Sequence, residues 1–170
     1  MCQSFINNKL WINENFGSVD LKDKRLNNRL KHTVEKVIER PGAGIPKQMS
    51  TWKDIKGCYR LLGNSKVSLK RIQTPHRNKV IKQSLEVKTK VVLFIQDTSE
   101  VESKPATKNL GPIGNHTCKG VMIHSCLAVE YSKSPKVIGL ANQQLWKRKE
   151  VSKCKNETRL ERSKRTGKES

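Results

Sequence analysis

The sequence predicts an α + α/β chain, in which a basic helical first half is followed by three consecutive strands. Apolar residues recur at one-turn spacing through most of the first half, and short apolar runs typical of strands replace that spacing after Lys90. The charge changes at the same point. Residues 47–90 hold twelve basic and two acidic residues, whereas residues 91–146 hold five basic and four acidic ones.

The longest predicted helix covers residues 18–40 and begins at a cap formed by Ser18 or Asp20. The apolar stripe of this helix consists of Leu21, Leu26, Leu30, Val34, Val37 and Ile38. A loop over residues 41–46, rich in proline and glycine, should end the helix.

A second helix is expected to begin near Ser50, where Thr51 and Asp54 form a pair typical of a capping box, and to end at Gly63. Its spacing predicts an inward face made of Trp52, Ile55, Tyr59 and Leu62. A third helix is expected to begin at Pro75 and to reach Leu85.

Three strands are expected over residues 89–97, 120–130 and 136–146, with residues 102–119 as a loop. The first of them contains the apolar run Val91–Ile95, which predicts a short buried strand. Asp97 follows that run, so we expect it where the core gives way to solvent.

The chain of 170 residues has a formal net charge of +20, which indicates a polyanionic partner. Lysine-rich composition alone would also raise the charge, but it should not spare the near-neutral stretch 91–146. The apolar run Val91–Ile95 is too short to cross a membrane, and the first sixteen residues contain no secretory signal. Five cysteines without a CxxC pair predict no disulfide framework, so a reduced, cytoplasmic chain is expected. If the polyanionic partner is DNA, the chain should be nucleoid-associated.

Five helical basic residues are candidates for contacting nucleic acid. Arg25 and Arg29 share a face of the first predicted helix, and Lys53, Lys56 and Arg60 lie on the second. Helical arginines and lysines contact phosphates and base edges. The alternative for each residue is an ordinary solvated helix face.

Two sets of residues are candidate metal ligands. Asp97 at the end of a strand could hold a divalent cation, although an aspartate there can also cap the next turn. His116, Cys118, His124 and Cys126 are all of zinc-binding types, but their spacing matches none of the common zinc fingers. Strand packing explains Cys126 equally well, so we expect no zinc.

Four stretches carry a resemblance to a known family. They are Phe16–Leu30 with its Asp23-Lys24-Arg25 and Arg29-Leu30 motifs, Ser50–Leu62 with Cys58-Tyr59-Arg60, Val92–Glu100, and Leu110–Trp146. In this order the stretches resemble the bacterial cut-and-paste DDE transposases of the Tn-five (insertion-sequence-four) group. Lys119 departs from the family, which usually has arginine before the glycine.

The resemblance implies a helical domain over residues 1–70 that binds transposon-end DNA, a connecting helix over 71–88, and the start of a ribonuclease-H-like catalytic core, with its first three antiparallel strands, over 89–146. A basic tail, residues 147–170, would follow. Asp97 would be the first of three acids that bind Mg²⁺ or Mn²⁺, and the other two acids of the family would lie beyond this chain. We therefore expect a truncated gene product that binds double-stranded DNA but neither nicks nor joins it.

Other interpretations of the function of this chain remain open. It could be a stand-alone basic nucleic-acid-binding module, or a regulator that forms mixed dimers with an intact transposase. Formation of a homodimer is a further alternative. It could also be an unstable relic without a function.

Overall fold

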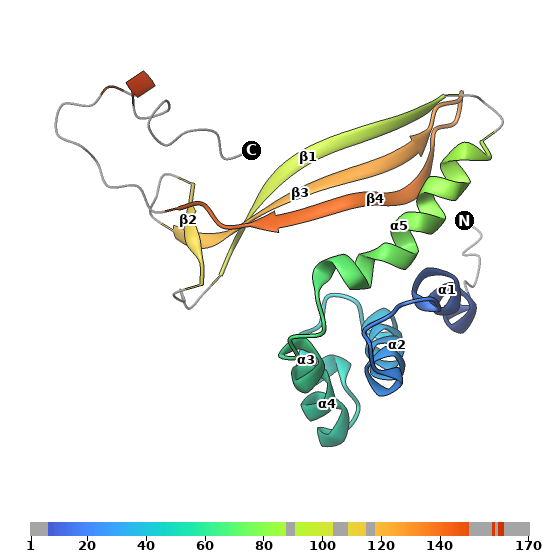
Figure 1. Cartoon of the computed structure of the whole chain (residues 1–170), viewed down its shortest axis with the longest axis vertical. Coiled ribbons are helices and arrows are strands. Elements are labelled where there is room, and N and C mark those ends of the chain that lie inside the picture. Colours follow the sequence, from blue (N-terminus) through green and yellow to red (C-terminus); the bar gives the residue numbers. More distant parts are fainter. Residues whose placement is uncertain are drawn as a thin grey trace. The chain divides into compact units, whose positions relative to one another are not determined.

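The computed structural model describes residues 7–87, 91–103, 109–114, 118–149, 158, 160 and 161. In this part of the chain, five helices precede a four-stranded sheet (Figure 1). Contacts divide the chain into two compact units. The first contains Met1–Phe94 and Leu127–Ala141, and the second contains Ile95–Cys126 and Asn142–Ser170.

The helices all belong to the first unit. They are α1 (Asn8–Phe16), α2 (Lys24–Glu39), α3 (Ile45–Gln48), α4 (Trp52–Leu62) and α5 (Leu69–Leu85). Helix α2 contacts α1, α3 and α4, and α1 also contacts α5. Figure 1 shows α2, α3 and α4 grouped together. The short α3 lies where the sequence predicted only a loop, and α1 was not predicted because its apolar residues lack a regular spacing.

A small apolar core holds these helices together. Val19, Leu21, Leu30 and Leu61 are buried, and they bring the segment before α2 into contact with α2 and α4. Around them pack the partly buried side chains of Phe16, Leu26, Val34, Val67 and Ile72. Each such buried aliphatic side chain contributes about 1.5–3 kcal/mol of burial free energy. The predicted apolar stripe is thus largely confirmed, except that Val37 is 39% exposed.

Helix α2 begins later than predicted. Its cap is Asp23, whose side chain accepts a hydrogen bond from the Arg25 backbone N–H, so neither Ser18 nor Asp20 caps the helix. The backbone of Lys22 has a positive φ of 62°, which cannot belong to an α-helix. Asp20 instead supports this turn, because its Oδ1 accepts from the Lys22 backbone N–H at 2.8 Å.

Helix α5 begins earlier than predicted. Ser68 caps it, and Pro75 lies buried inside the helix rather than at its first turn. The sequence predicts a start at Pro75 because proline is favoured at the first helical position, but here proline is tolerated inside the helix at the cost of one backbone donor. The helix therefore runs across residue 70, where the sequence predicted a domain boundary.

The sheet is organised around its longest strand. Its strands are β1 (Val92–Glu102), β2 (Gly111–Ile113), β3 (Cys118–Glu130) and β4 (Lys136–Trp146), and β3 pairs with each of the others. The three predicted strands are present. The fourth, β2, lies in the predicted loop, where Gly111 pairs with Gly120 and Ile113 with Cys118.

Strand β1 differs most from its prediction. It extends five residues beyond Asp97 to Glu102, and Phe94 and Ile95 are about half exposed. Among the described strands β1 lies at an edge of the sheet, paired with β3. The apolar run that predicted a buried strand is therefore open to solvent in this structure.

His76 joins α5 to two other elements of the first unit. The Leu140 backbone N–H of β4 donates to His76 Nε2 at 3.2 Å, so the opposite ring nitrogen carries the proton. That Nδ1–H then donates to Asn15 Oδ1 of α1 at 2.7 Å. Gly139 makes this approach possible, because a Cβ there would lie 2.6 Å from Val80 Cγ2. Burial, with a smaller effect from Lys79, lowers the pKa of His76 below its ordinary 6.5.

Because His76 is buried in these contacts, the free energy of unfolding of the first unit should fall in mild acid. The unfolded chain takes up the proton on His76 at a higher pH than the folded chain does, so the free energy of unfolding decreases as the pH falls through about 6.5. Urea unfolding between pH 7.5 and 5.5 checks this. His76→Gln should flatten the profile in this range, and an unchanged profile would show that the buried ring does not carry the effect.

Candidate nucleic-acid interface

Helix α4 begins at a reciprocal cap, as the sequence predicted. Thr51 Oγ1 accepts from the Asp54 backbone N–H at 3.1 Å and donates to Asp54 Oδ2 at 2.9 Å. Both the hydroxyl and the carboxylate are thereby fixed at the first turn of the helix.

The same carboxylate joins α4 to α2. Arg29 Nη1 donates to Asp54 Oδ1 at 3.2 Å, and His32 Nε2 lies 2.9 Å from that oxygen. The hydrogen bond from Thr51, then the contacts with His32 and Arg29, lower the pKa of Asp54 below its ordinary value. Asp54 is therefore held ionised between the two helices.

Arg29 occupies the space left by a glycine. A Cβ at Gly57 would lie 2.8 Å from Arg29 Cζ, so the guanidinium packs directly on the backbone of α4. Only 29% of the Arg29 side chain is exposed. These contacts give Arg29 a role in joining the helices, and its predicted contact with DNA stays a prediction.

The inward face of α4 matches the prediction only at Ile55, which is half-buried. Cys58 and Leu61 are buried, whereas Trp52 is 74%, Tyr59 53% and Leu62 56% exposed. The reason is the rotation of α4 about its own axis, which is set by the contacts of Asp54 with α2. Residues three and four apart share a face, so an Asp54 turned toward α2 brings Cys58 and Leu61 inward with it.

The opposite side of α4 combines cations with aromatic rings. Lys53, Lys56 and Arg60 are exposed, and together with Trp52 and Tyr59 they form what we call the outer face of α4. The pattern was present in the sequence, since all five residues lie within about one third of the helix circumference. From the sequence, the two aromatic residues are expected in the core rather than on a binding surface, because large apolar side chains are usually buried.

Arg25 lies on α2, and its side chain is 93% exposed. Its guanidinium lies 3.5 Å from Asp23, a loose contact in water that leaves the cation available to a ligand. Of the two predicted arginines, Arg25 is thus the accessible one.

A compact helical unit with a rigidly capped, cationic helix has the features of a DNA-binding domain. Comparison with protein families identifies the kind: residues 8–67 match the family described as transposase DNA-binding. This stretch includes all of α1–α4. No curated protein matches the chain. Residues 8–67 are therefore similar to the DNA-binding region of transposases, and this similarity supports DNA as a partner.

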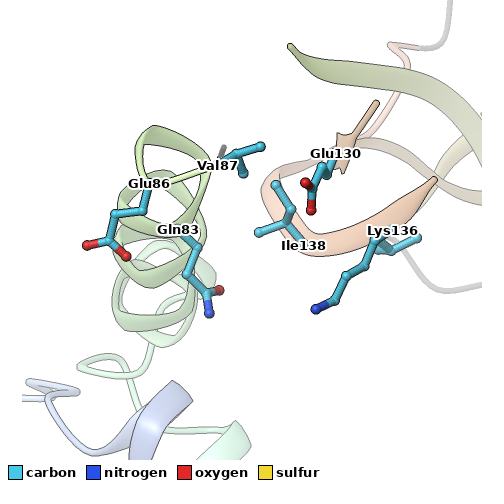
Figure 2. Close-up of a pocket in the computed structure, with 7 residues that line it drawn as sticks. Gln83, Glu86, Val87, Glu130, Lys136 and Ile138 are labelled. Atoms are coloured by element: carbon cyan, nitrogen blue, oxygen red, sulfur yellow. The ribbon is translucent and has the colours of Figure 1, made fainter. Parts of the chain in front are cut away.

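A cavity of about 390 Å³ also lies in the first unit, between the end of α5 and the turn from β3 to β4. Figure 2 shows Glu86 and Gln83 on one side of it, and Glu130 and Lys136 on the other. None of the predicted site residues lines this cavity, so it is separate from the outer face of α4.

Asp97 lies within β1 rather than at the end of a strand. Ser99 Oγ donates to Asp97 Oδ2 at 3.2 Å. The bonds from the Ser103 N–H to Lys119 O and from the Tyr131 N–H to Val91 O fit one antiparallel register of β1 and β3, which places Ser125 opposite Asp97. Asp97, Ser99 and Ser125 therefore share one face of the sheet.

Glu100 lies on the other face of the sheet. Side chains alternate along a strand, so Asp97 and Glu100 point in opposite directions. Glu100 accepts from Arg148 Nη1 at 2.8 Å and from the Gly114 backbone N–H at 2.7 Å. Within the described ranges, no three His, Cys, Asp or Glu side chains gather as metal ligands.

The residues considered for zinc are only partly described. His124 lies between two β1 side chains, with Nδ1 2.7 Å from Thr98 Oγ1 and Nε2 3.1 Å from Gln96 Oε1. Cys118 and Cys126 lie in β3 with His124, and His116 lies outside the described residues. The expectation of no zinc remains a prediction.

In the part of the chain that the structure describes, no helix is both long enough and apolar enough to span a bilayer.

The contacts of Asp54 predict separate effects for the two arginines. Asp54→Ala removes half of the cap and the acceptor for Arg29, so it should lower the free energy of unfolding by about 1–2 kcal/mol. Arg29→Ala should also destabilise the chain. Arg25→Ala should leave stability unchanged and lower DNA affinity. Urea unfolding and fluorescence anisotropy with labelled duplex DNA measure both quantities.

Glu86→Gln is the matched control for Asp54→Ala, because both side chains of the Lys82–Glu86 pair are largely exposed. It should change stability very little. Destabilisation by Arg25→Ala, with Arg29→Ala harmless, would contradict the assignment of the two arginines.

Proposed function

We propose that this chain binds transposon-end duplex DNA through the outer face of α4 and Arg25, as part of a cut-and-paste DDE transposase of the Tn-five group. The observation that carries the proposal is the family match over residues 8–67 together with an exposed cationic helix inside that stretch. Specific DNA-binding helices place such side chains against phosphates and base edges.

The packing around α4 suits a helix that contacts a groove. One side of α4 is fixed by Asp54 and by the burial of Cys58 and Leu61, so the outer face does not need to rearrange to bind. Side chains on a rigid element lose little conformational freedom on binding, which favours affinity. The net charge of +20 should add attraction to DNA of any sequence.

For the second half of the chain, we propose the start of a ribonuclease-H-like catalytic core with Asp97 as one metal ligand. The order of β1, β3 and β4, which follow one another as antiparallel neighbours, and the place of Asp97 within β1 support this proposal. The residues described here supply a single carboxylate on that face. By themselves they do not fit a centre of two metal ions, which needs several converging acids.

The DNA-binding proposal predicts a salt dependence that α4 controls. For the full chain, log affinity for duplex DNA should fall linearly with log salt concentration. Lys53→Ala, Lys56→Ala and Arg60→Ala should each reduce the slope by about 0.9 if the residue neutralises one phosphate. Fluorescence anisotropy over a salt series measures these slopes.

Lys133→Ala is the control for charge alone, since Lys133 is an exposed lysine in the turn between β3 and β4. It should leave the slope nearly unchanged. Equal effects of Lys133→Ala and the three α4 variants would mean that overall charge, rather than α4, binds the DNA.

The proposal for Asp97 is tested by metal binding rather than by activity. A single exposed carboxylate should hold Mn²⁺ only weakly, through water. Mn²⁺ should broaden the amide NMR signals of Ser99 and Ser125 in the wild type and not in Asp97→Asn, while DNA affinity stays the same in both. Broadening that persists in Asp97→Asn would remove Asp97 as the ligand.

A further inference from the structure

Two large aromatic side chains on the outer face of α4 have no role in the core. Trp52 is 74% exposed and Tyr59 is 53% exposed, although each ring could bury a large apolar area. Large apolar side chains gathered on one exposed face indicate a binding surface.

The spacing of the rings suits a regular ligand. Trp52 and Tyr59 are seven residues apart, or nearly two full turns, so both project from the same side of α4. At 1.5 Å per residue they are about 10 Å apart along the helix axis. Three base-pair steps of B-DNA span about the same distance.

The cations around the rings indicate which kind of ligand binds the outer face of α4. Lys56 lies between the rings along the helix, and Lys53 and Arg60 lie beside them on the same face. A ligand for this face must offer anions around a row of apolar groups. The DNA major groove does so, because it admits an α-helix between two phosphate backbones and exposes the 5-methyl group of thymine at its floor.

We propose that Trp52 and Tyr59 read thymine 5-methyl groups in the major groove, and that Lys53, Lys56 and Arg60 hold the flanking phosphates. This inference rests on the proposed function and deepens it. The cations supply affinity for any duplex, and the two rings supply a preference for thymines about three base pairs apart. The aromatic residues are therefore the specificity-determining residues of α4.

The experiment begins with the full chain and a pool of random duplexes, from which bound sequences are selected. The selected duplex is then remade with uracil in place of each thymine, which removes only the 5-methyl groups. Affinity should fall about four-fold for each contacted thymine, the effect of exposing one buried methyl group. Trp52→Ala should abolish the thymine–uracil difference at one position, and Tyr59→Ala at a second position about three base pairs away.

Two variants serve as controls. Trp52→Phe keeps an apolar ring and should retain part of the preference for thymine. Lys53→Ala should weaken binding to thymine and uracil duplexes equally, leaving their ratio intact. Because Trp52 and Tyr59 are exposed, their alanine variants should unfold at the wild-type urea concentration.

Several results would overturn the inference. Equal affinity of the wild type for thymine and uracil duplexes would do so while leaving DNA binding by the domain intact. So would a Trp52→Ala variant that changes self-association but not DNA recognition, which would assign the rings to a protein interface. A wild-type chain that binds no duplex DNA would overturn both this inference and the proposed function.

Discussion

Asp54 stabilises the start of its own helix through Thr51 and at the same time accepts hydrogen bonds from Arg29 and His32 on α2. One carboxylate thereby determines both where α4 begins and which side of it faces α2. The burial of Cys58 and Leu61, the close approach of Arg29 to Gly57 and the exposure of the outer face all depend on that choice. The remainder of the first unit supports the arrangement through the core around Leu21 and Leu30.

Much of the helical part was predictable because its signals are local. The cap at Thr51, the end of α4 at Gly63 and most of the apolar stripe of α2 require only neighbouring residues, and the structure confirms them. The inward face of α4 was not predictable from periodicity alone. Apolar residues occupy both sides of this helix, and the partner that selects one side, Arg29, lies 25 residues away in the sequence.

Local sequence signals predict even less of the sheet. The existence of β1, β3 and β4 follows from their composition, but the exposure of β1 depends on what packs against it, which no local pattern encodes. Strand β2 contains glycine and proline, which indicate a turn, and it becomes a strand only through pairing with β3. Asp97 was identified as a candidate, whereas its position inside β1 and its separation from Glu100 needed the strand register.

The alternation of side chains along β1 makes the face of Asp97 sensitive to the length of the strand before it. Deletion of a single codon between Val92 and Asp97, with the pairing of the preceding residues kept, would turn the Asp97 carboxylate to the face that Glu100 now occupies, and it would turn Glu100 away from Arg148. Deletion of two codons would return it to its own face, one pleat further along. Among small in-frame changes in this strand, those that remove an even number of residues should therefore be the less damaging ones.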